Sequence, residues 1–223
     1  VVDKINMSTT GDAVDFADLN YGTAQNGVHG SRTHAVFNGG YNNPTRQANT
    51  DYVTIASGGT AIAGGSLTTA RQLNGCSASN STRGLHIGGY VGPAHSPEFV
   101  NTIDYITFSE KSAAVDFGDM TNANERCGSC ASPTRAIMGG GEAPSRVNTI
   151  QYFTMMTLGN TVDFGDLTRV TSGAFGAGNA VTCLIAGGET SSAQVNNIDS
   201  VTIATLGNSL DFGDLTTARR LGG

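Results

Sequence analysis

Asp163-Phe164-Gly165-Asp166-Leu167 is one copy of a phrase that organises the whole chain. Close copies lie on both sides of it, at Asp116–Met120 and Asp211–Leu215, and a variant begins at Asp15 as Asp-Phe-Ala-Asp-Leu. Neighbouring copies are spaced by about 48 residues or about twice that distance, the period class of propellers and other repeat arrays. The repeat therefore predicts that the 223 residues form one array.

Two further markers recur with the same period. The first is a hydrophobic stretch that ends in paired glycines, at Gly39-Gly40, Gly88-Gly89, Gly139-Gly140 and Gly187-Gly188. The second is a phrase that begins Asn101-Thr102-Ile103-Asp104-Tyr105 and is echoed from Asn148 and Asn197. Because β-branched and aromatic residues favour strands and glycines favour turns, both markers indicate short strands separated by tight turns.

The repeat at residues 121–167 shows the expected order of strands. Residues 121–131 are small and polar and suit a strand near a central axis, and the next strands are expected at 135–138, 147–155 and 161–164. Four short antiparallel strands are the content of one propeller blade. Such a sheet has two apolar faces, so blades must pack face to face. The repeated phenylalanines are predicted to fill the space between blades (Phe16, Phe117, Phe164 and Phe212).

Composition agrees with an all-β chain and narrows its partners. The 31 glycines suit many tight turns, and no stretch has sustained helical spacing of apolar residues. The net charge of −6 and the scattered arginines argue against nucleic acid as a partner, because phosphate binding needs clustered cations. No apolar run approaches the ~20 residues that span a bilayer, so we expect no membrane insertion.

The four cysteines leave several interpretations open. Cys127-Gly128-Ser129-Cys130 has the form of redox and zinc sites, but no second pair of zinc ligands lies nearby in the sequence. Cys76 and Cys130 are interpreted as the same position of successive repeats. Buried free thiols are the favoured interpretation, with a local disulfide and a metal site as alternatives. The redox state of Cys127 and Cys130 is left undetermined.

A double glycine that closes the second strand, followed by a strand of the Ile103-Asp104-Tyr105 type, resembles kelch repeats. Phenylalanine stands near the place of the tryptophan typical of the kelch fourth strand, and the chain has no tryptophan. The wording Asp-Phe-Gly-Asp-Leu-Thr, then Ala-Arg, Ser-Thr-Arg-Gly and Gly-Gly, is similar to repeats in virion proteins of tailed bacteriophages. The resemblance covers essentially the whole chain. It implies a propeller that binds and does not catalyse, because kelch propellers serve mainly as interaction platforms.

These observations predict an all-β fold, a five-bladed kelch-like β-propeller with four-stranded antiparallel blades, as a single domain over residues 1–223. Four blades are expected at residues 20–67, 68–120, 121–167 and 168–215. Residues 1–19 and 216–223 are expected to form a composite blade that joins the two termini. Such closure would remove exposed sheet edges. The alternative is a chain that continues beyond these residues in a longer protein.

Carboxylates, arginines and histidines are the candidates for chemistry. The paired aspartates of the repeated phrase offer the oxygen ligands that Ca²⁺ prefers, but Asp also caps turns, and capping is the favoured interpretation. The arginines that recur before the second strand are expected to pair with a nearby Asp (Arg32, Arg83 and Arg135). His34 and His86 lie in adjacent second strands, and later repeats supply no further histidine. We therefore expect no metal, no cofactor and no catalytic residue.

The loops after the paired glycines are the predicted binding surface, because recognition usually resides in variable loops on a constant scaffold. Its residues are Tyr41, Asn42, Tyr90, His95, Glu142, Arg146 and Glu189. The leading hypothesis is a non-enzymatic structural or binding module of a phage virion, associated with tail or capsid. Its partners would be other virion subunits or a host-surface glycan, and its location the virion or the extracellular space. The alternative is a soluble multivalent glycan-binding lectin with one sugar pocket in each blade.

Overall fold

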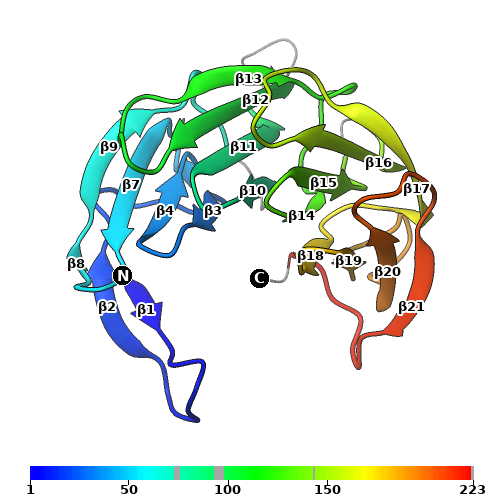
Figure 1. Cartoon of the computed structure of the whole chain (residues 1–223), viewed down its shortest axis with the longest axis horizontal. Coiled ribbons are helices and arrows are strands. Elements are labelled where there is room, and N and C mark those ends of the chain that lie inside the picture. Colours follow the sequence, from blue (N-terminus) through cyan, green and yellow to red (C-terminus); the bar gives the residue numbers. More distant parts are fainter. Residues whose placement is uncertain (73–75, 93–97, 143, 222–223) are drawn as a thin grey trace.

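The computed structural model describes residues 1–72, 76–92, 98–142 and 144–221. Within these residues the fold is all-β, and the strands form five main sheets arranged as an arc (Figure 1). The all-β prediction is confirmed, and so is the four-stranded antiparallel sheet as the repeating unit. We number the sheets 1 to 5 in chain order.

Sheets 2 to 5 each contain four antiparallel strands in sequence order, so that each repeat supplies one sheet. Sheet 2 consists of β3 (Gly27–Gly30), β4 (His34–Asn38), β7 (Asn49–Thr54) and β9 (Ile62–Ser66). Sheet 3 consists of β10 (Ser77–Ser79), β11 (Arg83–Tyr90), β12 (Phe99–Thr107) and β13 (Val115–Asp119). Sheet 4 consists of β14 (Gly128–Ala131), β15 (Arg135–Gly139), β16 (Val147–Thr154) and β17 (Val162–Thr171). Sheet 5 consists of β18 (Phe175–Gly178), β19 (Thr182–Ala186), β20 (Asn197–Thr202) and β21 (Leu210–Asp214).

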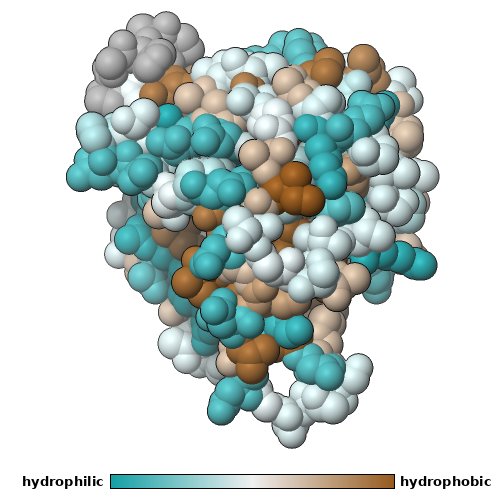
Figure 2. Space-filling view, turned by 90° about the vertical axis from the view of Figure 1, so that its left-hand side faces the viewer, coloured by the Kyte–Doolittle hydropathy of each residue, from teal (hydrophilic) through white to brown (hydrophobic). Residues whose placement is uncertain are grey.

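Sheet 1 has three strands and differs from the others. β1 (Val2–Lys4) pairs with β2 (Val14–Asp18), and β2 pairs in parallel with β8 (Gly59–Thr60), which comes from the turn before β9. A separate hairpin, β5 (Tyr41–Asn42) with β6 (Thr45–Arg46), lies in the loop between β4 and β7. Figure 2 faces the side of the molecule that carries β2, β8 and β9, where hydrophilic and intermediate residues cover most of the surface between small hydrophobic patches.

The described residues do not form the predicted composite sheet. Residues 216–221 contain no strand, and the arc is open between sheet 1 and sheet 5 (Figure 1). The Arg219 carbonyl instead accepts a hydrogen bond from the Gly188 amide at 2.8 Å, as the Arg71 carbonyl does from Gly40 at 2.8 Å. Because Arg71 lies in the connection that leads from sheet 2 to sheet 3, residues 216–221 are the equivalent connection after sheet 5. They therefore correspond to the segment that precedes the first strand of a sheet.

Aromatic packing joins each sheet to the next, as predicted for three of the four phenylalanines. Phe117 on β13 is buried against Phe153 on β16, with ring centroids 5.1 Å apart. Phe164 on β17 is buried in a cluster with Val201 and Ile203 of sheet 5. Phe16 is half-buried and packs between sheets 1 and 2, against the cluster of Ala17, Val53 and Ala61. Phe212, on the last sheet, is 63% exposed, because no further sheet covers it.

Backbone hydrogen bonds repeat along the same interfaces. In the turn before β17, the amides of Gly159 and Thr161 donate to the carbonyls of Phe117 and Asp119 at 2.9 and 2.8 Å. In the turn before β21, the amides of Gly207 and Ser209 donate in the same way to the carbonyls of Phe164 and Asp166, both at 2.9 Å. The turn of one sheet thus rests on the outer strand of the sheet before it.

Gly118 shows what the glycine of the repeated phrase does in sheet 3. Its φ is +144°, and a Cβ there would lie 2.4 Å from the Gly159 carbonyl oxygen. A larger residue would therefore push the turn of the next sheet away and strain its own backbone.

Sheet 2 replaces the missing phenylalanine of its fourth strand with a tyrosine from its third. Gly64 occupies the position that Phe117 has in sheet 3, and a Cβ on Gly64 would meet the Tyr52 ring at 2.3 Å. Tyr52 is buried there with Val36, Ile106 and Phe108. The altered wording of this repeat therefore preserves an aromatic filling between sheets 2 and 3.

Polar side chains in the third strands hold the connections between sheets. The Asp104 carboxylate accepts from the Thr68 amide at 3.0 Å and from Arg71 Nη2 at 3.0 Å, and both charged side chains are fully buried. The matching residues of sheets 2, 4 and 5 are Asp51, Gln151 and Asp199. In the same order, they accept hydrogen bonds from Asn20, Thr121 and Thr168, which lie in the segments that lead into these sheets.

The recurring arginines differ from prediction, because those of sheets 3 and 4 bind carbonyl groups. Arg83 donates to the Met155 carbonyl at 3.3 Å, and Arg135 donates to the Ile203 carbonyl at 2.9 Å, in each case across to the next sheet. Each guanidinium also lies over a tyrosine ring, 4.6 Å from Tyr105 and 4.5 Å from Tyr152. Arg83 and Arg135 therefore join sheets, and neither has a carboxylate partner among the described residues.

The cysteines also correct the sequence interpretation. Cys130 and Cys183 form a disulfide between sheets 4 and 5, with Cα atoms 6.0 Å apart, while Cys76 and Cys127 are free and buried. Cys130 pairs in register with Ile137 as Ala78 does with Leu85, so Cys76 is not its equivalent. Periodicity could not identify the pair, because its two members occupy different positions of their own repeats.

One position on the first strand of sheets 2, 3 and 4 faces one position on the second strand of the next sheet. A comparison of registers shows that this pair of positions is filled in three ways. Between sheets 4 and 5 it holds the disulfide, and between sheets 3 and 4 it holds Ala78 and Ala136. Between sheets 2 and 3 the same two positions are His29 and Gly84. A Cβ on Gly84 would lie 2.0 Å from His29 Cδ2, so glycine makes room for the imidazole.

Candidate binding surface

The loops after the paired glycines lie in register with one another. Backbone bridges join the first residue of each loop to a connection, and these four residues are Tyr41, Tyr90, Glu142 and Glu189. In sheet 4 the glycine pair that matches those of the other sheets is Gly140-Gly141, one residue later than the sequence pattern suggested. Gly140 has a φ of +69°, close to the +59° of Gly88, the first glycine of the pair in sheet 3. We call the edge of the arc formed by these loops the rim. It carries tyrosine in sheets 2 and 3 and glutamate in sheets 4 and 5.

The two tyrosines belong to one aromatic cluster, which we define as Tyr41, Arg46, Tyr90 and Phe99. The Arg46 guanidinium carbon lies 4.9 Å from the centroid of each tyrosine ring. Tyr90 also packs on Phe99, with centroids 5.1 Å apart. A guanidinium between two aromatic rings is stabilised by attraction to their π faces. Arg46 thus joins the loops of sheets 2 and 3.

Local sequence explains the position of Arg46. The β5–β6 hairpin pairs Tyr41 with Arg46 and Asn42 with Thr45, which places Tyr41 and Arg46 side by side. Gly92, at φ +108°, faces the guanidinium, and a Cβ there would approach Arg46 Cζ to 2.9 Å. Asn42 is exposed at the hairpin. The last predicted residue of this region, His95, lies outside the described residues.

The two glutamates belong to an ion-pair network, which we define as Glu142, Arg146, Glu189, Arg126 and Arg220. Arg146 Nη2 lies 2.8 Å from Glu189 Oε1, and Arg220 Nη1 lies 2.5 Å from Glu189 Oε2. Glu142 Oε2 lies 3.6 Å from Arg126 Nη1 and 3.8 Å from Arg146 Nη2. The network joins the rim of sheets 4 and 5 to the connections beside them.

Glu189 is the most strongly held carboxylate of this network. Burial opposes its ionisation, but hydrogen bonds from Arg220 and Arg146 outweigh that effect and lower its pKa. The carboxylate is therefore ionised at neutral pH, and its charge is already balanced by two guanidinium groups.

An open groove of about 580 Å³ lies beside the network. Glu142, Arg146 and Arg169 line it together with small polar residues of the neighbouring loops. Arg169 is exposed and makes no ion pair with any residue that the structure describes, unlike the three arginines of the network. The groove therefore presents one cation that is free to bind an acidic group.

Sequence reasoning missed Arg46, Arg126 and Arg220. Arg46 follows Tyr41 at the spacing of a short hairpin, which is a usable signal. Arg126 and Arg220 lie in connections, away from the variable loops, and their sequence context carries no such signal. The contact of His86 with His29 of β3, whose ring centroids lie 4.5 Å apart, was also missed.

Comparisons with known proteins leave the family of this chain open. A scan against protein-family models and a search of curated protein sequences found no match. Among the described residues, no three His, Cys, Asp or Glu side chains are grouped closely enough to hold a metal ion. The same part of the chain contains no helix with the length and apolar character needed to cross a membrane.

Proposed function

We propose that the chain is a five-bladed, kelch-like β-propeller that serves as a non-enzymatic binding module of a phage virion, associated with its tail or capsid. In this role it attaches the particle to its host or docks other virion subunits. The proposal is supported by one four-stranded sheet per repeat, by face-to-face packing of successive sheets, and by the resemblance of the repeat wording.

The observation that carries the binding role is the division of the rim. Equivalent positions hold tyrosine in two neighbouring sheets and glutamate in the next two. One half therefore offers aromatic faces and hydroxyl groups, and the other offers ion pairs beside the exposed Arg169. A partner that contacts both halves must be extended and chemically uneven, as the surface of a protein subunit is.

A catalytic role is less well supported because the perturbed histidines and the perturbed cysteine are out of reach of a substrate. Burial lowers the pKa of His29 and His86 and raises that of Cys76, and all three lie inside the seams between sheets. Catalytic groups must approach the reacting atoms of a substrate. The rim groups instead satisfy one another.

The lectin alternative requires a sugar pocket in each blade. Tyr41 and Tyr90 are equivalent and favour it in sheets 2 and 3, since tyrosine rings stack on sugars. Glu142 and Glu189 take the same positions and are bound by arginines. We therefore favour one extended partner surface over four equal pockets.

Replacing Arg46 by alanine is expected to weaken binding of the recombinant chain to purified virions about ten-fold, because the two tyrosines lose the cation that orders them. Binding can be measured by co-sedimentation with particles in which mass spectrometry detects this chain. Arg32→Ala is the matched control, since Arg32 is exposed in the loop between β3 and β4. Absence of the chain from purified particles would refute the virion role, and a tyrosine-dependent signal on a glycan array would favour the lectin.

A further inference from the structure

We propose that the free face of sheet 5 is a docking surface for the chain's own N-terminal hairpin, which we define as residues 3–13. This inference rests on the proposed five-bladed ring. It differs from the composite sheet expected from the sequence, because residues 216–221 take part as a connection and supply no strand. Three independent features of the two surfaces match: apolar side chains, backbone groups and charge.

The apolar match follows from the register of the third strands. In sheets 3, 4 and 5, the two residues that cover the preceding sheet are buried, and they are Ile106 with Phe108, Phe153 with Met155, and Val201 with Ile203. The same positions after β1 are Ile5 and Met7, which are 67% and 95% exposed. Opposite them in the repeat scheme stands Phe212, which is 63% exposed, whereas its counterparts Phe117 and Phe164 are buried by the next sheet. Each surface thus exposes the residues that the other would cover.

The backbone match follows from the turn that ends each hairpin. Gly159, Asn160 and Thr161 bind the outer strand of sheet 3, and Asn160 Oδ1 accepts from the Asp119 amide at 3.0 Å. Gly207, Asn208 and Ser209 bind sheet 4 in the same way, with Asn208 Oδ1 at 3.0 Å from the Asp166 amide. The N-terminal hairpin has Gly11, Asp12 and Ala13 at these positions. Their partners on sheet 5 would be the Phe212 carbonyl and the backbone of Asp214.

Gly213 supports this match. It has a φ of +143°, as Gly118 and Gly165 have +144° and +148°. A Cβ on Gly118 or Gly165 would collide with the turn of the next sheet, whereas a Cβ on Gly213 would meet nothing within 4 Å. Sheet 5 thus has the conformation that receives a turn, without a turn in place.

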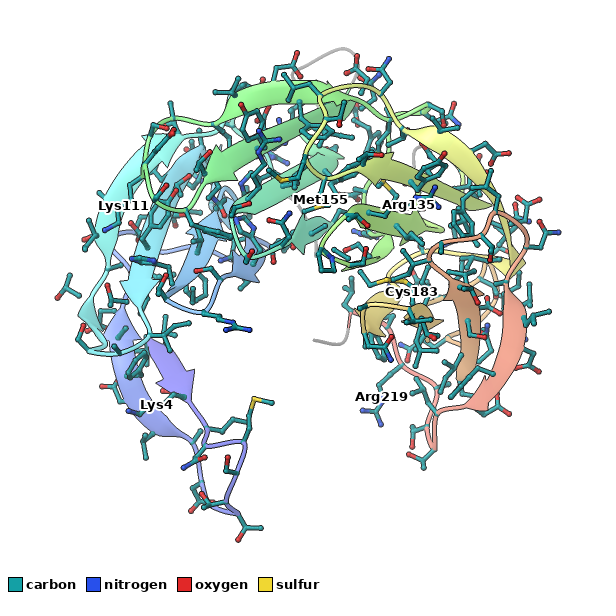
Figure 3. The ribbon with its side chains drawn as sticks, in the orientation of Figure 1. Lys4, Lys111, Arg135, Met155, Cys183 and Arg219 are labelled. Carbon is teal, nitrogen blue, oxygen red and sulfur yellow. A yellow bond between two sulfur atoms is a disulfide. The ribbon has the colours of Figure 1, made fainter. Side chains whose placement is uncertain are left out.

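The charge match involves Asp3 and Arg219. Asp104 is held by Thr68 and Arg71 of the connection that precedes its sheet. By register, Asp3 is the counterpart of Asp104, and Thr216 and Arg219 are the counterparts of Thr68 and Arg71. All three are exposed, and Lys4 and Arg219 lie on opposite sides of the opening (Figure 3). Closure would bring the Asp3 carboxylate to an arginine that already has the required backbone position.

The test is a disulfide cross-link between Asp12→Cys and Asp214→Cys, the counterparts of Asn160 and Asp119. Under mild oxidation of dilute protein, we expect an intramolecular bond, because closure raises the effective concentration of the two thiols. Peptide mass spectrometry identifies the bond, and a non-reducing gel shows whether it lies within one chain. The matched control is Asp12→Cys with Asp166→Cys, since the Asp166 amide is already bound by Asn208. We expect the control to cross-link about ten-fold less.

A charge exchange tests the role of Asp3 separately. In the Asp12→Cys/Asp214→Cys background, Asp3→Arg or Arg219→Asp alone should reduce the yield of the cross-link, and both together should restore it. Both positions are exposed, so the variants should fold. No intramolecular bond, or a bond only between two chains, would overturn the inference. Virion binding is tested at Arg46, between the loops of sheets 2 and 3, and the cross-link is tested between sheets 1 and 5. The loss or retention of virion binding therefore does not decide whether the cross-link forms.

Discussion

Asp104→Ala is expected to lower the free energy of unfolding by about 3–5 kcal/mol, the usual effect of removing one partner of a buried ion pair. The variant leaves the Arg71 guanidinium fully buried without its carboxylate, and it also removes the acceptor for the Thr68 amide. Urea denaturation measures the loss, with the slope of the transition checking that unfolding remains cooperative.

The chain itself provides the control for this experiment. In sheet 4 the same two positions are Gln151 and Asn124, which carry no charge. Gln151→Ala is therefore expected to cost only about 1–3 kcal/mol. The double variant Arg71→Asn with Asp104→Gln should recover most of the stability lost in Asp104→Ala. An equal loss in Asp104→Ala and Gln151→Ala would contradict the importance of the buried charges.

Acid is expected to destabilise the fold through His29 and His86. Both imidazoles are buried, and none of their four ring nitrogens bonds to a described residue. Burial lowers the pKa of His29 from 6.5 to about 3, and burial, His29 and Arg71 lower the pKa of His86 in the same direction. The charged groups nearby are Arg71 and its partner Asp104, which lies opposite His86 in the sheet.

The direction of the effect follows from proton uptake. Below pH 6.5 the unfolded histidines take up protons while the folded ones stay neutral, so stability falls as pH falls. Each histidine contributes up to about 1.4 kcal/mol per pH unit in this window, so His29 alone should cost about 2 kcal/mol between pH 6.5 and 4.5. His86 adds to this loss. Denaturation midpoints measured across this range test the prediction.

A matched variant uses the residues that the chain places between sheets 3 and 4. His29→Ala with Gly84→Ala reproduces Ala78 and Ala136, and His86→Met reproduces Met138. This triple variant should lose most of the dependence on pH between 6.5 and 4.5. An unchanged slope would mean that other groups, such as exposed carboxylates, cause the acid sensitivity.

The repeat predicted the sheets because its period reflects a constraint that acts on every copy. Phe117 and Phe164 must fill the space before the next sheet, and Gly118 and Gly165 must admit its turn. The same reasoning failed at the ends of the array. Phe212 has the wording of a buried residue, but its exposure depends on what lies beside sheet 5, which the local sequence does not encode.

The candidate surface was predicted less completely. Variability pointed to Tyr41 and Tyr90, and the structure joins them through Arg46. The disulfide and the histidine pair escaped prediction because each joins residues of different repeats at positions that are filled in another way elsewhere. Such pairs are set by three-dimensional register, and a one-residue error in aligning the glycines of sheet 4 was enough to hide the tyrosine–glutamate pattern of the rim.

Hydrogen exchange of the turn amides tests the central claim most directly, because these amides find their partners only in the preceding sheet. The Gly159, Thr161, Gly207 and Ser209 amides should exchange slowly in residue-resolved NMR measurements, close to the rates of the central strands. The Gly11 and Ala13 amides report separately on the opening of the arc. Exchange of the first four as fast as that of an exposed loop would show that the sheets do not pack one upon another.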